Sequence, residues 1–136
     1  MKKIQYILFS FLLGVATLRA QVDSKYTTLL GQFPAQNAKQ LQKNMEDMAA
    51  LGKSGIAQLA SMLVSADKGN NAKIQYALGG FSYFVTQNGK EDLRKMAAEA
   101  YGEALGKVAD KENQAFLIFQ LQQVGKDESV AVLAPY

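Results

Sequence analysis

The sequence predicts an all-α protein built as an array of antiparallel helical hairpins. Three observations lead to this prediction. Apolar residues recur at intervals of three and four in several segments, which is the spacing of one face of an α-helix. Glycines and short polar runs separate these segments, as is typical of turns between helices. No segment shows a convincing alternation of apolar and polar residues, which is the pattern of a half-buried β-strand.

The first two helices are marked by the residues that end them. A short helix is expected over residues 24–30, because Gly31 and Pro34 follow it. A second helix is expected over residues 37–51, where apolar residues are spaced by three and four and Gly52 closes the segment.

A third helix and a polar loop come next. Ser54 is the candidate N-cap of this helix. The apolar stripe of the helix consists of Ile56, Leu59, Ala60 and Leu63. Residues 67–71 form the loop, and either Asn70 or Asn71 is able to cap the helix that follows.

The fourth helix is expected over residues 72–87. One face carries an apolar stripe made of Ile74, Leu78, Phe81, Phe84 and Val85. Tyr76 and Tyr83 lie seven residues apart on a different face. Aromatic residues at helical spacing usually belong to a core, but these two lie off the stripe, and tyrosine is common in protein interfaces. Tyr76 and Tyr83 are therefore the candidate interaction surface, for a protein or, alternatively, for a small ligand such as a sugar.

The fifth helix begins at Glu91 and Asp92, whose negative charges suit the N-terminal end of the helix dipole. Its apolar stripe is the most regular in the chain and consists of Leu93, Met96, Ala97, Ala100, Tyr101, Ala104, Leu105 and Val108. Two ion pairs with i, i+4 spacing are expected on its exposed side, Glu91 with Lys95 and Glu103 with Lys107.

The end of the chain predicts two more helices. Asp110 is the candidate N-cap of the sixth, and Gly125 ends it. Its apolar residues point to several sides, so we expect burial on several sides; they are Phe116, Leu117, Ile118, Phe119, Leu121 and Val124. Asp127 is the candidate cap of a seventh helix that runs from residue 128 to at least residue 133.

Residues 1–20 have the composition of a secretory signal peptide. Lys2 and Lys3 precede an apolar run over residues 7–13, and a small residue stands before Gln21. The run is shorter than the roughly 20 apolar residues that cross a bilayer. We therefore expect an exported protein, periplasmic or on the cell surface, that begins at Gln21 and has no stable membrane span after cleavage. An uncleaved N-terminal anchor is the alternative.

Removal of residues 1–20 changes the charge of the chain. The formal charge of +3 comes from three of the 15 basic residues, which leaves 12 basic (15 − 3) and 12 acidic residues in the rest. This balance lacks the positive surplus that binding to nucleic-acid phosphates requires. We expect no nucleic-acid partner.

The sequence contains no histidine and no cysteine. These residues are the usual ligands of zinc, and histidine is the commonest general base. We therefore expect a protein that is not an enzyme, with no catalytic residue, no cofactor and no metal site. The acidic pairs at 46–47 and 127–128 point in different directions on a helix, which favours solvated charges and capping over paired-carboxylate chemistry.

Two stretches of the sequence resemble each other. Residues 48–59 and 121–133 each contain a helix end, an apolar residue before Gly-Lys, a polar cap, and then Ile or Val, Ala, a variable residue and Leu. They lie 73 to 74 residues apart (121 − 48 and 133 − 59), or two units of about 37. The second stretch resembles a HEAT repeat. This resemblance implies a HEAT-like α-solenoid, an α-α superhelix, over residues 21–136.

The signal peptide and the cysteine-free composition resemble those of exported proteins of Bacteroides-type bacteria that carry long HEAT chains. A solenoid needs a terminal cap, so we expect this domain to be incomplete at its C-terminus, as the N-terminal part of a longer repeat chain. The first hypothesis is an exported, non-catalytic scaffold that binds an unknown protein partner. The alternative is the non-catalytic repeat region of a longer exported enzyme, for example one that acts on carbohydrate.

Overall fold

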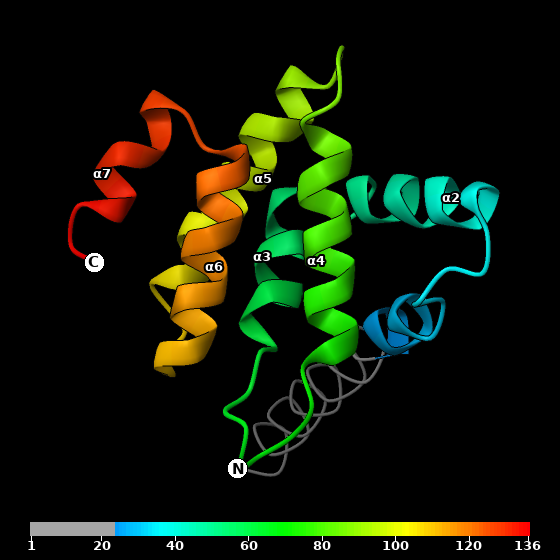
Figure 1. Ribbon diagram of the computed structural model, residues 1–136, viewed down its shortest axis with the longest axis horizontal. Helices are drawn as coiled ribbons and strands as arrows, with labels where there is room; N and C mark the ends of the chain where they lie inside the picture. Colours follow the sequence, from blue (N-terminus) through cyan, green and yellow to red (C-terminus); the bar gives the residue numbers. More distant parts are fainter. Residues whose placement is uncertain (1–23) are drawn as a thin grey trace, which may run out of the picture.

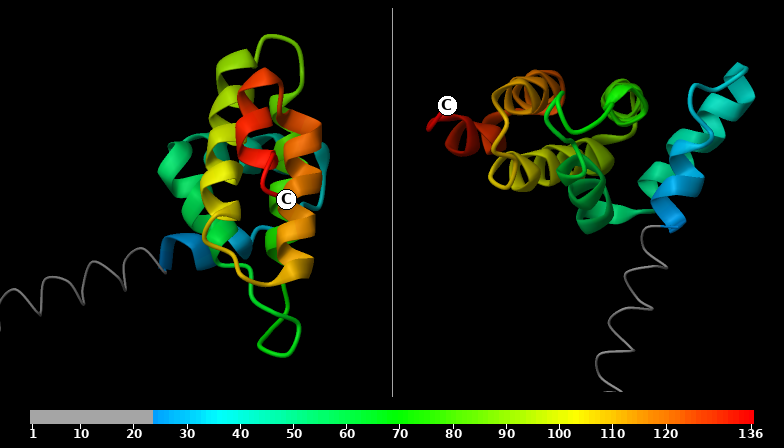
Figure 2. Two further views of the ribbon diagram at one scale, coloured as in Figure 1. Left: turned by 90° about the vertical axis from the view of Figure 1, so that its left-hand side faces the viewer. Right: turned by 90° about the horizontal axis from the view of Figure 1, so that it is seen from below.

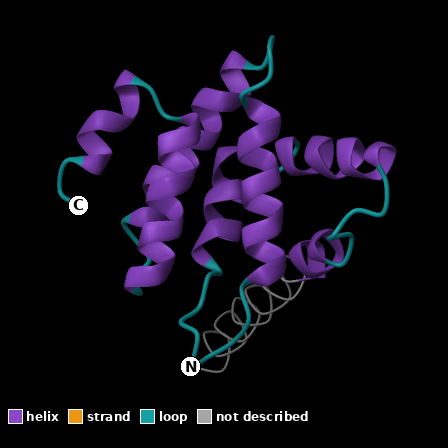
Figure 3. Cartoon of the chain, in the orientation of Figure 1, coloured by secondary structure: helices purple, strands orange, loops and turns teal. Residues whose placement is uncertain are grey.

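The computed structural model describes residues 24–136, and every element of regular secondary structure in this range is a helix (Figure 3). The all-α prediction is therefore confirmed for these residues. The predicted signal peptide, residues 1–20, lies outside the described residues. From residue 24 onward, no helix combines the length and the apolar character that crossing a bilayer requires.

The helices follow the segments expected from the sequence, with ends that shift by a few residues. Residues 24–30 are helical. The elements after them are α2 (Ala38–Ala49), α3 (Gly52–Ser61), α4 (Ala72–Val85), α5 (Glu91–Leu105), α6 (Lys111–Val124), the 3-10 helix η1 (Asp127–Ser129) and α7 (Val130–Leu133).

Helices α3 to α6 form two hairpins, α3–α4 and α5–α6, that lie next to each other (Figure 1). Seen from below, they make two layers, with α3 and α5 in one and α4 and α6 in the other (Figure 2). Helix α2 crosses the first hairpin at a steep angle, and α7 lies at the opposite end of the row (Figure 1).

The core lies between the two layers and is built from the predicted apolar stripes. Its fully buried centre includes Ile56, Leu59, Leu78, Phe81, Tyr101, Leu105, Leu117 and Leu121. Within the stripe of the fifth helix, only Leu93 and Met96 remain partly exposed. Helix α5 also contributes four buried alanines. Their short side chains let neighbouring helices approach closely on more than one side.

A polar cluster crosses this core from α4 through α5 to α6. The Tyr101 hydroxyl donates to the Leu78 carbonyl oxygen at 3.0 Å, and the Ser82 hydroxyl donates to Oε1 of Gln120 at 2.8 Å. Ser82, Tyr101 and Gln120 are each at most 2% exposed. Burial raises the pKa of Tyr101, so its hydroxyl keeps the proton that it donates. The cluster joins the two hairpins through hydrogen bonds from which water is excluded.

The helix starts agree with the sequence in part. Asp110 caps α6 as predicted, by accepting a hydrogen bond from the N–H of Asn113 at 3.0 Å. The prediction that Ser54 caps the third helix is wrong, because α3 already begins at Gly52. Gly52 has a φ of 67°, a left-handed conformation that glycine adopts without a Cβ clash, and it turns the chain directly from α2 into α3.

The C-terminal elements differ most from expectation. Phe119 is 55% exposed, although we expected the sixth helix to bury apolar residues on several sides. Helix α6 packs mainly against α4 and α5. Its buried apolar side chains are Leu117, Leu121 and Val124. Asp127 does not cap a helix; it is the first residue of η1, which has no side-chain cap.

The buried polar cluster predicts the effect of removing one hydroxyl. Tyr101→Phe deletes the donor to the Leu78 carbonyl, and we expect the free energy of unfolding to fall by about 1–2 kcal/mol. Urea unfolding followed by circular dichroism measures this change. Tyr83→Phe is the matched control, because that hydroxyl belongs to a side chain that is 70% exposed. Equal stabilities of the two variants would show that the cluster contributes nothing.

Candidate functional site

Tyr76 and Tyr83 lie on the outside of α4, as the sequence predicts. Tyr76 is 50% exposed and Tyr83 is 70% exposed, whereas Phe81 and Phe84 of the same helix are buried. Seven residues make about two helical turns, so both tyrosines emerge from one side of α4. With Leu41 of α2, which is 37% exposed, they form what we call the tyrosine surface.

A small cavity of about 140 Å³ opens between α2 and α4 beside Tyr83. Its apolar lining residues are Ala38, Leu41, Met45, Tyr83 and Phe84, and Gln42 and Gln87 supply uncharged polar groups. Gly80 also lines it, and a Cβ at Gly80 would only just touch Met45, with 3.5 Å to Cε. At Gly79 a Cβ would meet no atom within 4 Å. Between the two tyrosines, the surface of α4 is therefore open at Gly79 and covered by Met45 at Gly80.

The segment before α2 supports Tyr76. The rings of Phe33 and Tyr76 meet edge to face, with 6.1 Å between their centroids. Phe33 is only 2% exposed, so it offers a fixed contact to the exposed ring. The segment is itself held to α2 by Asn44, whose Nδ2 donates to the Gln32 carbonyl at 3.0 Å. Sequence periodicity gave no signal for this contact, because Phe33 lies outside any helix.

A charged cluster that the sequence did not indicate joins α5 to the end of α6. Arg94 is 7% exposed and donates from Nη1 to the Val124 carbonyl and to Glu128 Oε1, the latter at 2.6 Å. Its Nε donates to Glu91 Oε1 at 3.0 Å, and Lys126 bonds to the same oxygen at 2.8 Å. Glu91 therefore pairs with Arg94 and Lys126 instead of the expected Lys95.

The pairings of this cluster shift the pKa values of its carboxyl groups. Lys126 and then Arg94 lower the pKa of Glu91, and Arg94 lowers the pKa of Glu128, because their hydrogen bonds favour the charged carboxylate. The second expected pair, Glu103 with Lys107, is present at 2.7 Å. The bond from Arg94 to Glu128 holds η1 against α5.

The acidic pair of α2 has partners on its own helix. Asp47 pairs with Lys43, and Glu46 accepts a hydrogen bond from Gln42 at 2.7 Å. Among residues 24–136, no group of three acidic side chains is close enough to hold a metal ion.

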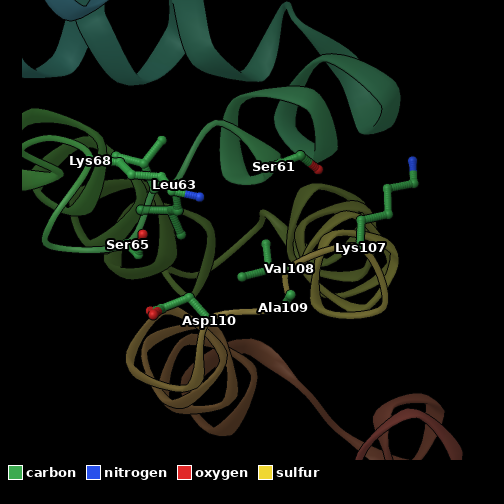
Figure 4. Close-up of a pocket in the computed structure, with 9 residues that line it drawn as sticks. Ser61, Leu63, Ser65, Lys68, Lys107, Val108, Ala109 and Asp110 are labelled. Carbon is green, nitrogen blue, oxygen red and sulfur yellow. The ribbon is translucent and has the colours of Figure 1, made fainter.

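A second cavity, of about 450 Å³, lies where the loop between α3 and α4 meets the connection between α5 and α6 (Figure 4). Its lining combines apolar residues with three charged ones, Lys68, Lys107 and Asp110. Figure 4 shows the Lys107 side chain extending away from the other lining side chains. The sequence marked Asp110 only as a helix cap, and the cavity depends on contacts between segments about 40 residues apart.

The Arg94 cluster predicts an acid-sensitive contribution to stability. Glu91 and Glu128 have folded-state pKa values below their ordinary 4.5, so the unfolded chain takes up protons first as the pH falls. The stabilisation that the paired Glu91 and Glu128 carboxylates contribute is complete above pH 4.5, the pKa of these groups in the unfolded chain. It is lost as the pH falls through their lowered folded-state pKa values. We expect Arg94→Met to be less stable than the parent at neutral pH, and the difference to narrow in acid.

Urea midpoints measured over this pH range test the prediction. Lys43→Met is the control, because its pair with Asp47 is exposed and contributes little. A difference between parent and Arg94→Met that stays constant from neutral pH into acid would contradict the assignment.

No protein-family model matches this chain, and no curated protein or solved structure matches it either.

Proposed function

We propose that this chain is an exported, non-catalytic helical-repeat scaffold that binds a protein partner through the tyrosine surface. The observation that carries the proposal is the position of Tyr83, which is 70% exposed and borders an apolar cavity between α2 and α4. Tyrosine is enriched among the residues that dominate binding energy, and these residues lie in well-packed pockets at interface centres.

The chemistry of the surface favours a protein over a charged ligand. The cavity beside Tyr83 is lined by apolar side chains and by the amides of Gln42 and Gln87, without a charged group. Its volume of about 140 Å³ is below the roughly 300 Å³ at which small-molecule pockets begin. A single apolar side chain of a partner suits such a cavity, with the tyrosine rings packed on either side of it.

A HEAT-like solenoid is the architecture that we propose for the array. Two features support it. Successive hairpins stack so that α3 packs on α5 and α4 packs on α6, which is the side-by-side contact of repeat proteins. The two similar stretches, residues 48–59 and 121–133, both fall at junctions between helices, α2 with α3 and α6 with η1.

Photo-crosslinking tests the partner surface. A photoreactive phenylalanine analogue at position 83 of the full chain, expressed in its native host, is expected to give one discrete cross-linked protein. The same analogue in place of Glu99, an exposed residue of α5 in the other layer, is the control. A second variant carries the analogue at position 76. The proposal would be contradicted by equal cross-linked products at positions 83 and 99, or by the absence of any cross-linked product at both 83 and 76.

Binding to the protein identified in this way is then expected to depend on Tyr83. Tyr83→Ala should raise Kd at least tenfold, since truncating an interface anchor costs upward of about 1.4 kcal/mol. Isothermal titration calorimetry measures the change, with circular dichroism as the check that the variant is folded. Because Tyr83 is exposed, its loss should leave the thermal midpoint nearly unchanged.

Export predicts a defined N-terminus. Mass spectrometry of the N-terminal peptide of the protein recovered from the cell envelope or medium should place its first residue at Gln21. Ala20→Phe should block processing, because the cleavage site requires a small residue, whereas Ser24→Ala should not. Recovery of the intact chain from the cytoplasm would refute both the signal peptide and the export.

A further inference from the structure

The cavity of Figure 4 has the dimensions of a small-molecule site. Its volume of about 450 Å³ lies within the usual range of roughly 300–1,000 Å³. It shares no lining residue with the cavity beside Tyr83. The two cavities therefore have separate linings and can be altered separately by mutation.

One wall of the cavity is a long loop that is held in a fixed conformation. Residues 62–71 connect α3 to α4, and this loop exceeds the roughly two to eight residues that usually join helices. The Val64 N–H donates to Asn71 Oδ1 at 3.0 Å, while the Val64 carbonyl accepts from Asn71 at 2.6 Å and from Asn113 at 2.8 Å. Asn113 lies in α6 and is 2% exposed.

The two amide side chains also bond to each other, with Asn71 Nδ2 donating to Asn113 Oδ1 at 3.0 Å. In addition, a Cβ at Gly69 would lie only 3.0 Å from Val64 Cγ2, so the loop folds closely on itself. The second hairpin thus positions a loop of the first. A wall that is ordered in advance reduces the entropy lost when a ligand binds.

Lys68 and Asp110 place opposite charges on one side of this cavity. Figure 4 shows Lys68, Ser65 and Asp110 in a row, with Val108 and Ala109 across from them. Neither Lys68 nor Asp110 forms an ion pair with any of residues 24–136. Asp110 uses one oxygen to cap α6 and has a second available. The other lysine, Lys107, is neutralised by Glu103.

The remaining wall is apolar. Val108 and Ala109 lie together on this wall, and Leu63 lies beside Lys68 on the other side of the cavity (Figure 4). Leu63 and Val108 are 6% and 7% exposed. A ligand that matches Lys68, Asp110 and the apolar lining carries an anionic group, a cationic group and an apolar group. A ligand with one charge leaves either Lys68 or Asp110 without a counter-charge.

We propose that this cavity binds a free α-amino acid with an apolar side chain. The carboxylate of the ligand bonds to the Lys68 ammonium group and the Ser65 hydroxyl. Its ammonium group bonds to the second oxygen of Asp110, and its side chain packs against Leu63 and Val108. Charge-assisted hydrogen bonds to the carboxylate and to the ammonium group, both on the α-carbon, fix the orientation of the ligand.

Nuclear magnetic resonance titration of the ¹⁵N-labelled chain tests the proposal with three probes. L-leucine carries all three groups, isocaproate lacks the ammonium group, and isoamylamine lacks the carboxylate. Leucine is expected to produce saturable shifts at the amides of Ser65, Lys68 and Val108. Each of the two truncated probes is expected to bind about tenfold more weakly, because it loses one ionic hydrogen bond.

Two variants assign the contacts. Lys68→Gln should raise the Kd of leucine and of isocaproate about tenfold and leave the Kd of isoamylamine unchanged. Asp110→Asn should raise the Kd of leucine and of isoamylamine and leave the Kd of isocaproate unchanged. The fold should survive this change, because asparagine is as good a helix cap as aspartate. Lys73→Gln, at an exposed position of α4 outside the cavity lining, should leave the Kd of all three probes unchanged.

The proposal is overturned if leucine gives no saturable shift at these amides. It is equally overturned if isocaproate or isoamylamine binds as tightly as leucine, or if both cavity variants bind leucine like the parent. None of these results would bear on cross-linking at position 83, so failure here and failure of the partner surface remain distinguishable.

Discussion

The structure depends on the close packing of α5 against its neighbours. Helices α3, α4, α6 and η1 all contact it, and its buried side chains include four alanines together with Tyr101 and Leu105. Alanine at these positions lets backbones approach, while Tyr101 fills the space that remains and carries its hydroxyl to α4. The neighbouring hairpins become one body because α5 belongs to one of them and packs on the other. Both candidate sites lie at the margins of this body, where loops and α2 add to it.

Local patterns account for the part of the fold that could be predicted. The stripes of the third, fourth and fifth helices identify their buried faces, because helical periodicity is a property of neighbouring residues. The capping role of Asp110 is local in the same sense. Arg94 and Ser82 could not be assigned in this way, since their partners Glu128 and Gln120 lie 34 and 38 residues away. Polar residues on a helix are ordinarily read as solvent-facing, and only tertiary packing made these two exceptions.

The candidate sites also combine features that local sequence patterns predict with features that only tertiary packing creates. Tyr76 and Tyr83 could be identified because they fall off the apolar stripe of their helix, and exposure follows from that position. The cavity beside Tyr83 could not, because half of it comes from α2, whose direction across α4 has no sequence signature. The cavity of Figure 4 joins a loop of one hairpin to the connection within the next. Its charged side chains stand in separate polar segments, where each has an ordinary local explanation as a loop residue or a helix cap.

The hydrogen bond between Ser82 and Gln120 has a mechanical consequence. An array of hairpins can bend when one hairpin slides along the next. Here a slide of one turn would separate Ser82 from Gln120 and Tyr101 from the Leu78 carbonyl. The buried Gln120 amide and Tyr101 hydroxyl would lose these partners in a medium of low dielectric constant, which is costly. The boundary between the two hairpins therefore behaves as a stiff joint. At the end of the array, α7 adds no such buried polar contact: Val132 rests on Gly102 of α5, and no residue of α7 is buried.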